Sequence, residues 1–417
     1  MMNCHLSKHS RCTLILLMAA AASLGCGPQP TTKVKVERSP PDGHARMHEA
    51  LDGIRQRALV DNPYFQTASV ARQKSQLAGL PLSGQDMDRF VLLGLLAQDY
   101  RRLGKIELAV EHLQAAEQLR AKAGLVIQRE SETQFLFEIG LTYLRLAETE
   151  NCVHCQTGES CILPIQGEGI HQKRIGSRKA VEYFTRVLQR DPQHLSAKWL
   201  LNIAAMTLGE FPDEVPPQFR LPPGAFESPH KFPRFLDIAG AVGLKTVNCG
   251  GGVITQDFDE DGLIDVLTST WDPAGQIHYF RNTGDGTFSD QTATAGLTGL
   301  LGGINLIQGD FDNDGHVDAL VLRGAWLAEQ GKQPCSLLKN LGGGRFRDVT
   351  FDVGLGDIQY PTPTAGWSDY DNDGDLDLYV GHEVAPSQLY RNDGQKGFTN
   401  VTSQAGVSND RFAKAVA

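Results

Sequence analysis

One nine-residue pattern, Asp-x-Asp-x-Asp-Gly-x-x-Asp, occurs three times in the C-terminal half of the chain. The copies span residues 257–265, 310–318 and 369–377, which we call the first, second and third acidic loops. Each loop leads into a short apolar run and then into a second run that ends in Asn-x-Gly. Short apolar runs separated by Asn, Asp and Gly are typical of β-strands joined by tight turns. We therefore predict that this region folds as repeated copies of one β-structural unit.

The spacing between the copies indicates the kind of β-structure. Successive acidic loops begin 53 and 59 residues apart, which is the length of one four-stranded β-propeller blade with its connections. Three blades do not close a propeller, which typically has roughly four to eight. Residues 409–417 resemble the lead-in to the third loop at residues 363–367. We therefore expect residues 234–417 to form an incomplete β-propeller, truncated at its C-terminal end; the alternative is that a partner supplies the missing blades.

The residue types in each acidic loop suit a calcium ion. Calcium prefers about six to eight oxygen ligands in a flexible arrangement, whereas magnesium demands a tighter octahedron. Asp at positions 1, 3, 5 and 9 can converge on one ion, and glycine at position 6 permits the sharp turn that a Cβ atom would hinder. The backbone carbonyl of position 7 can complete the ligand set. With about one ion per loop, the expected ligands are Asp257, Asp259, Asp261, Leu263 and Asp265, then Asp310, Asp312, Asp314, His316 and Asp318, then Asp369, Asp371, Asp373, Asp375 and Asp377.

The alternative is an Asx-rich turn without metal, because Asp, Asn and Gly favour turns in any protein. Four carboxylates within about 6 Å of one another would repel strongly and raise one another's pKa unless a cation lay among them. Three loops in matched register therefore favour calcium. Extracellular calcium modules bind with dissociation constants of roughly 10⁻⁴–10⁻³ M, so we expect the ions to be structural.

The loops and their flanking segments, such as WSDYDNDGDLDLYV at residues 367–380 and LYRNDG at residues 389–394, resemble FG-GAP/VCBS repeats of integrin α-subunit propellers. They are more similar to the family related to cartilage acidic protein, often described with ASPIC/UnbV domains. The resemblance begins at Phe235 and implies a seven-bladed propeller, calcium in the outer loops and a role in adhesion or recognition. The ASPIC segment itself does not occur in the chain, so we expect no function from it.

Residues 1–26 have the pattern of an export signal. A basic start precedes an apolar run at residues 13–24, which is too short to span a bilayer. The small residue before Cys26 resembles a bacterial lipoprotein processing site and implies lipidation of Cys26; simple secretion is the alternative, because Ser23 stands where that motif usually has Leu. We expect an exported protein, either a cell-envelope lipoprotein or a secreted or periplasmic protein, with a flexible linker at residues 27–45.

Residues 46–210 have helical periodicity. Apolar positions three and four apart at residues 90–100 and 106–116 predict a helical hairpin that resembles a tetratricopeptide unit. A second such unit is split between residues 136–143 and 180–192. We therefore expect an N-terminal helical-repeat, tetratricopeptide-like domain, with a generic helical bundle as the alternative.

A proline-rich linker separates the two regions. Residues 211–233 contain seven prolines, and proline removes a backbone donor and disfavours helix at the residue before it. Neither a helix nor a central strand can run through this segment. The chain is therefore predicted to be a multidomain α plus β protein with its domain boundary here.

A cysteine-rich insertion at residues 151–175 interrupts the second helical unit. Two of its cysteines have the Cys-x₂-Cys spacing, which, with a further Cys and His, suits a zinc site. In an exported protein a disulfide is the more usual use of cysteine, and we favour a Cys152–Cys161 pair over metal. The candidate residues for either role are Cys152, Cys155, Cys161, His154 and His171.

The charge distribution restricts the function. The net charge is −10, and residues 234–417 hold 12 Lys and Arg against 25 Asp and Glu; a nucleic-acid surface would need clustered basic residues. The sequence contains no nucleophile elbow, phosphate loop, dinucleotide fingerprint or zincin motif. We therefore expect a non-enzymatic scaffold for binding, adhesion or recognition, with protein or glycan partners at the cell surface and membrane contact only through a lipid anchor. The alternative is a propeller-based hydrolase or lyase whose active site lies partly beyond the C-terminus.

Overall fold

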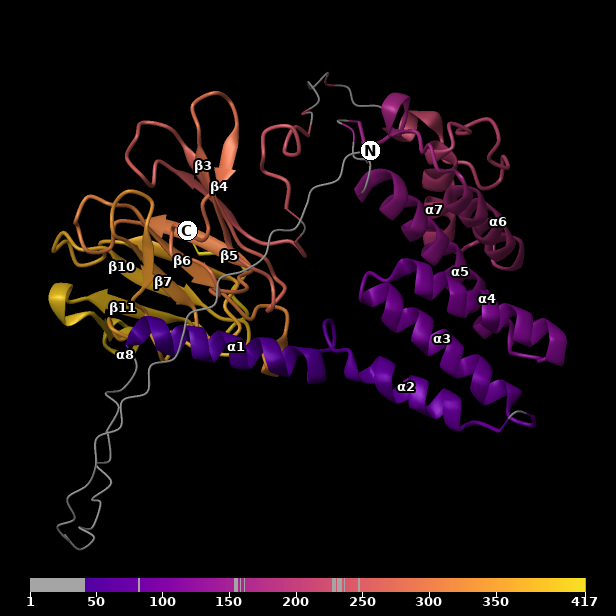
Figure 1. The fold of residues 1–417 in the computed structure, drawn as a ribbon, viewed down its shortest axis with the longest axis horizontal. Coiled ribbons are helices and arrows are strands. Elements are labelled where there is room, and N and C mark those ends of the chain that lie inside the picture. The colour runs from indigo at the N-terminus through magenta and orange to yellow at the C-terminus, as the bar shows by residue number, and fades with distance from the viewer. Residues whose placement is uncertain are drawn as a thin grey trace, which may run out of the picture. The chain divides into compact units, whose positions relative to one another are not determined.

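The computed structural model describes residues 42–416, except for 82, 154–156, 158, 161, 227–229, 231–234, 236 and 247. Helices form the first part of this chain and β-sheets the second, which confirms the α plus β class (Figure 1). The predicted export signal with Cys26 lies outside the described residues. Within the described residues, no helix is both long enough and apolar enough to cross a membrane.

Seven α-helices precede the sheets in the described chain: α1 (Gly43–Asp61), α2 (Ala68–Gly79), α3 (Asp86–Arg102), α4 (Ile106–Ala123), α5 (Arg129–Glu148), α6 (Ile175–Arg190) and α7 (Leu195–Thr207). The predicted apolar faces of α3 and α4 are buried; for example, Leu96 and Ala109 are both 0% exposed. They share one hydrophobic core with residues of α5, α6 and α7, such as Leu136, Phe184 and Leu201. Helices α3 to α7 are thus held together by a single continuous core.

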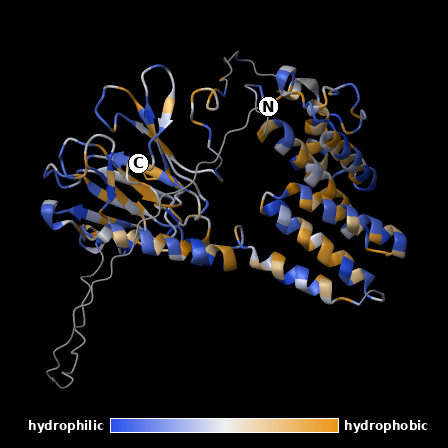
Figure 2. Ribbon diagram, in the orientation of Figure 1, coloured by the Kyte–Doolittle hydropathy of each residue, from blue (hydrophilic) through white to orange (hydrophobic). Residues whose placement is uncertain are grey.

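Twelve strands form three antiparallel sheets, each of four strands in chain order. Sheet 1 contains β1 (Val253–Gln256), β2 (Asp265–Thr268), β3 (His278–Asn282) and β4 (Phe288–Asp290). Sheet 2 contains β5 (Asn305–Gly309), β6 (Asp318–Leu322), β7 (Ser336–Asn340) and β8 (Phe346–Asp348). Sheet 3 contains β9 (Thr364–Ser368), β10 (Asp377–Gly381), β11 (Gln388–Asn392) and β12 (Phe398–Asn400), and the short helix α8 (Thr402–Ala405) follows it. The predicted repetition of one β-unit is confirmed, since each acidic loop joins the first and second strands of its sheet. Apolar residues lie along the central strands, while the connecting loops are mainly hydrophilic (Figure 2).

Each of the first two acidic loops is fixed to the next sheet by the residue at its second position. The ring of Phe258, in the first loop, packs edge-on against Phe346 of β8, with 5.5 Å between ring centroids. The carbonyl oxygen of Phe258 accepts a hydrogen bond from Asn340 Nδ2 at 2.9 Å. The second loop repeats this contact, because Asn392 Nδ2 donates to the carbonyl oxygen of Phe311 at 2.7 Å. The same interface therefore joins sheet 1 to sheet 2 and sheet 2 to sheet 3.

Helix α1 belongs to the core of the sheets. Its residues Met47, Leu51 and Ile54 are buried in one hydrophobic cluster with residues of sheets 1 and 2 and their connections, such as Leu300 and Leu338. We predicted a flexible linker at residues 27–45 and a single helical domain at residues 46–210, and this helix begins in the former range and continues into the latter. Helical periodicity identifies an apolar face but not the surface against which it packs, so the sequence did not indicate this partner.

Polar contacts fix the start of α1 on the same sheets. The backbone N–H of Gly43 donates to Asp352 Oδ1 at 3.0 Å. His44 Nδ1 accepts a hydrogen bond from the backbone N–H of Asp348, the last residue of β8, at 3.1 Å. Both contacts join residues more than 300 positions apart in the chain, so they depend on the tertiary fold.

Leu51→Ala should therefore destabilise sheets 1 and 2. Leu51 is 2% exposed, and truncating a buried leucine costs about 2–5 kcal/mol of unfolding free energy. Hydrogen exchange measured by mass spectrometry should show faster exchange in peptides that cover β1 to β8. Glu49→Ala, at an exposed position of the same helix, is the matched control. Faster exchange confined to α2–α7 would contradict the packing of α1 on the sheets.

Candidate metal centre

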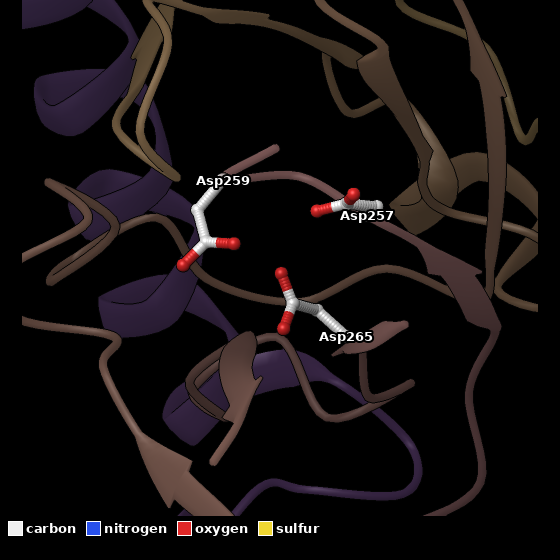
Figure 3. A group of neighbouring side chains, drawn as sticks. All are labelled: Asp257, Asp259 and Asp265. Carbon is white, nitrogen blue, oxygen red and sulfur yellow. The ribbon is translucent and has the colours of Figure 1, made fainter. Parts of the chain in front are cut away.

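Each acidic loop brings three carboxylates together. One oxygen from each of Asp257, Asp259 and Asp265 lies within 4.8 Å of the others, and the three side chains point toward a common centre (Figure 3). Calcium–oxygen distances of about 2.3–2.6 Å place ligands on opposite sides of the ion at roughly 4.6–5.2 Å, so one ion can contact all three. The equivalent triads in the other loops are Asp310, Asp312 and Asp318, and Asp369, Asp371 and Asp377.

The ninth position of each loop supplies the buried member of its triad. This residue is the first of the second strand, and it is 0–1% exposed in all three loops. In the second loop, Asp318 Oδ1 accepts the backbone N–H of Asn340 at 2.7 Å, and its Oδ2 accepts that of Phe311 at 3.1 Å. The equivalent backbone bonds hold Asp265 and Asp377. The carboxylate is thus held in place by the strand that follows and by the loop that precedes it.

Burial changes the electrostatics of these ninth-position carboxylates. The pKa of Asp318 is raised to about 7, first by desolvation and also by the charges of Asp312 and Asp314, while the backbone hydrogen bonds from Asn340 and Phe311 act to lower it. Burial is likewise the first cause of the raised pKa values of Asp265 and Asp377. A buried carboxylate beside other carboxylates is stabilised in its charged form by a nearby cation, so the triads fit a cation.

The Asp at position 1 and the Gly at position 6 determine the backbone conformation of each acidic loop. Asp310 accepts the backbone N–H groups of Asp314 at 3.1 Å and Gly315 at 2.9 Å, and the first and third loops repeat both bonds. Gly315 has φ 90°, a left-handed conformation that glycine adopts without steric cost. The residue at position 4 is left-handed as well, for example Asn313 with φ 56°, and Asn tolerates this region better than most residues. The predicted requirement for glycine at position 6 is therefore confirmed.

The fifth position lies beside the triad. In the second loop, Asp314 Oδ1 accepts the backbone N–H of His316 at 3.0 Å, and the other two loops make the same bond. The triads therefore comprise positions 1, 3 and 9 of each loop. Ligation by Asp261, Asp314 and Asp373, and by the position-7 carbonyls of Leu263, His316 and Asp375, stays a prediction.

Residues 257–321 match the FG-GAP-like repeat family. This match confirms the FG-GAP resemblance for a stretch that begins at the first acidic loop and ends within β6. The narrower similarity to the cartilage acidic protein family and the tetratricopeptide assignment stay predictions. The chain matches none of the curated proteins with which it was compared.

Basic side chains on the third strands of sheets 1 and 2 contact the FG-GAP-like loops. Arg281 of β3 forms ion pairs with Asp259 and Asp261. Lys339 of β7 forms an ion pair with Asp312 and a second with Asp314 at 3.0 Å. These cationic groups show that the carboxylates at positions 3 and 5 accept positive charge in the folded chain. The sequence alone did not indicate these ion pairs, although each basic residue stands directly before the Asn that recurs in all three repeats.

The third loop differs in this contact. Arg391 occupies the corresponding position on β11, but its guanidinium pairs with Asp393 at 2.8 Å. The ion pair with Asp393 keeps the Arg391 side chain at the turn that follows β11. Among the described basic residues, none forms an ion pair with the third triad. The third triad therefore carries the least compensated negative charge of the three.

Neighbouring loops also contact each other directly. Glu260, at position 4 of the first loop, pairs with the His316 imidazole at position 7 of the second loop, and this pairing raises the pKa of His316. Asn313, at position 4 of the second loop, donates to Asp375 Oδ1 at position 7 of the third loop at 2.8 Å. Position 4 of one loop thus contacts position 7 of the next, a relation that spacing within one repeat does not reveal.

The structure brings together two of the five candidate residues in the cysteine-rich insertion. Cys152 Sγ lies 3.4 Å from His171 Nε2, while His154, Cys155 and Cys161 lie outside the described residues. Elsewhere, Cys335 is buried and Cys249 is an exposed thiol.

Proposed function

We propose that the three sheets are consecutive blades of a calcium-binding β-propeller that serves as a binding or recognition scaffold at the cell envelope. The observation that carries this proposal is the triad of carboxylates, which recurs in all three loops with the same backbone hydrogen bonds. The FG-GAP-like match supports a propeller-like recognition role.

The chemistry of the donor set favours calcium over a transition metal. Each triad offers only carboxylate oxygens, which suit calcium and magnesium, whereas zinc and copper favour nitrogen and sulfur donors. A bound calcium ion would supply positive charge at the buried ninth-position Asp and at the more accessible Asp residues of positions 1 and 3. The ion would thereby rigidify the loop that contacts the next blade.

The helical region before the sheets is proposed to be a tetratricopeptide-like array and a second binding surface. This proposal is supported by the hydrophobic core that α3–α7 share. Residues 103–105 join α3 to α4 as a helical hairpin. Export and anchoring are proposed from residues 1–26 and lipidation of Cys26. We expect partners to be proteins or glycans at the cell surface and expect no catalytic activity.

An exposed tryptophan supports a recognition face on the sheets. Trp326 is 62% exposed, yet its backbone has φ 66°, a left-handed conformation that is strained for a bulky residue. The backbone N–H of Trp326 donates to the two Glu383 carboxylate oxygens at 2.9 and 3.0 Å. The indole lines a cavity of about 530 Å³ together with Pro363 and Phe412. Strained residues persist where their surroundings enforce them and cluster at binding sites, so this cavity is the face on which we expect a partner.

Calcium stoichiometry tests the proposal. Equilibrium dialysis of the full chain at millimolar calcium should give about three ions per chain, because affinities of such modules are roughly 10⁻⁴–10⁻³ M. Asp312→Asn should reduce the number to two, since it removes one charged member of the second triad. Glu329→Gln removes an equal charge from an exposed side chain outside the triads and should leave three. A chain that binds no calcium, or a variant Asp312→Asn that still binds three ions, would contradict the proposal.

A further inference from the structure

The acidic loops differ in the partners of their fifth-position carboxylates. In every loop, Oδ1 of this Asp accepts the backbone N–H of position 7 at 2.9–3.0 Å. In the first loop, Oδ2 of Asp261 pairs with the guanidinium of Arg281. In the second loop, Oδ2 of Asp314 pairs with the Lys339 ammonium at 3.0 Å. The same two basic side chains also pair with the Asp at position 3 of their loops, so both carboxylates are engaged before any ion binds.

The third loop has no such ion pair. Asp373 Oδ1 accepts the backbone N–H of Asp375 at 3.0 Å, and no described basic side chain pairs with its other oxygen. Arg391, which corresponds to Arg281 and Lys339, instead pairs with Asp393 at 2.8 Å. The carboxylates at positions 3 and 5 of the third loop are therefore not neutralised by a basic side chain of the described chain.

This difference has a local cause in the sequence. Two residues after the basic side chain, the third repeat has Asp393, whereas the first and second repeats have Thr283 and Leu341. Neither threonine nor leucine can form an ion pair, so Arg281 and Lys339 have no acidic partner at that turn position. They contact the acidic loops instead.

The third loop also carries more negative charge. Its position 7 is Asp375, where the first and second loops have Leu263 and His316. The third loop thus contains five Asp residues, whereas the other two contain four each. More acidic side chains and no paired basic side chain distinguish the third loop from its two neighbours.

Both differences bear on calcium affinity. Loops of this chemistry tune their affinity through the number of charged ligands and the rigidity of the site. A carboxylate oxygen that is paired with a basic group can contact an ion only after that pair opens, and the basic group also repels the ion. A partly exposed ion pair contributes up to about a fivefold factor to an equilibrium constant. The paired loops should therefore bind calcium more weakly.

We propose that Arg281 and Lys339 are affinity-determining residues, which compete with calcium for the carboxylates at positions 3 and 5 of their loops. The third loop is consequently the high-affinity site of the chain, with Asp373 available as a further ligand beside its triad. The Arg391–Asp393 pair makes this possible, because it keeps the basic side chain at the turn. This inference rests on the calcium-binding function proposed above and assigns different intrinsic affinities to the three sites.

Full-length variants that keep one working loop test the proposal. Asp259→Asn combined with Asp371→Asn leaves the second loop, and Asp259→Asn combined with Asp312→Asn leaves the third. In calcium titrations by isothermal calorimetry, the third loop should bind at least about threefold more tightly than the second.

Lys339→Gln, made in the chain that keeps the second loop, should lower its dissociation constant for calcium by about three- to tenfold. Lys332→Gln is the matched control, because it removes the same charge from an exposed side chain that pairs with Glu329, outside the triads. It should change the dissociation constant less than about twofold.

A double-mutant cycle tests the competition directly. Asp314→Asn should weaken calcium binding at least about threefold more in the background of Lys339→Gln than in its absence, because only the released carboxylate can serve the ion. In the chain that keeps the third loop, Asp393→Thr should raise the dissociation constant about threefold by releasing Arg391, and adding Arg391→Gln should restore tight binding.

The outcomes separate this inference from the function on which it rests. If the wild-type chain binds three calcium ions but Lys339→Gln leaves the affinity of the second loop unchanged or lowers it, the competition is overturned and the calcium scaffold stands. Equal affinities of the second and third loops would overturn it as well. A wild-type chain that binds no calcium would contradict the proposed function, and this inference with it.

Discussion

Saturating calcium should raise the unfolding free energy of the sheets by about 2.7 kcal/mol for each occupied loop, when free calcium exceeds the dissociation constant a hundredfold. With three triads in the chain, the total is roughly 8 kcal/mol if all three loops unfold with the sheets. The physical reason is mass action, since the folded loops gather carboxylates that the unfolded chain disperses. Urea unfolding, followed by hydrogen exchange of peptides from β1 to β12, should show a higher midpoint in calcium than in a chelator.

Magnesium at the same concentration provides the control for this measurement. It should shift the midpoint less than calcium, because it demands a smaller octahedral site and gives up its water reluctantly. Helices α3–α7 have their own core, so their exchange should depend little on calcium. Unfolding curves of the sheets that coincide in calcium and chelator would contradict a structural role for the ions.

Asp318→Ala should destabilise the sheets even without calcium, by about 2–6 kcal/mol. Asp318 is 0% exposed and accepts the backbone N–H groups of Phe311 and Asn340. Removing the carboxylate leaves two buried donors without a partner, and each such loss costs about 1–3 kcal/mol. The variant should also lose the increment that calcium gives to the second loop. Urea unfolding in chelator and in calcium measures both effects.

Asp312→Ala is the matched comparison, because Asp312 belongs to the same triad but is exposed. It should lose the calcium increment while changing stability in chelator by less than about 1 kcal/mol, the usual contribution of an exposed ion pair such as that with Lys339. The difference between the two variants in chelator separates the hydrogen-bonding role of Asp318 from ligation. Equal stability of the two variants in chelator would show that the ninth-position Asp has no such structural role.

The repeating β-units and their loops could be predicted from sequence because their determinants are local. The short apolar runs, the turn glycines and the spacing of Asp257, Asp259 and Asp265 all lie within one repeat. The convergence of these three carboxylates therefore followed from loop geometry alone. Local pattern also identified the apolar faces of α3 and α4.

Contacts between segments that are separated in the chain could not be predicted in this way. The packing of α1 on the sheets, and the ion pairs of Arg281 and Lys339, depend on how distant segments are placed in space. The periodicity of a helix shows which face is apolar but not what that face contacts. A single basic residue likewise does not show which acidic residue it pairs with. His171 was noted as a candidate ligand, but its contact with Ser177 Oγ, six residues later in the chain, was not predicted.

The contacts from Glu260 to His316 and from Asn313 to Asp375 link consecutive acidic loops. They should therefore affect how the loops respond to calcium concentration. The second and third loops each have their seventh residue positioned by a side chain from the preceding repeat, so ordering one loop lowers the entropy that remains to be lost by its neighbour. Ion uptake along this edge should accordingly be cooperative, with a titration steeper than that of independent sites. A modest change in external calcium concentration would then order or disorder the three acidic loops together.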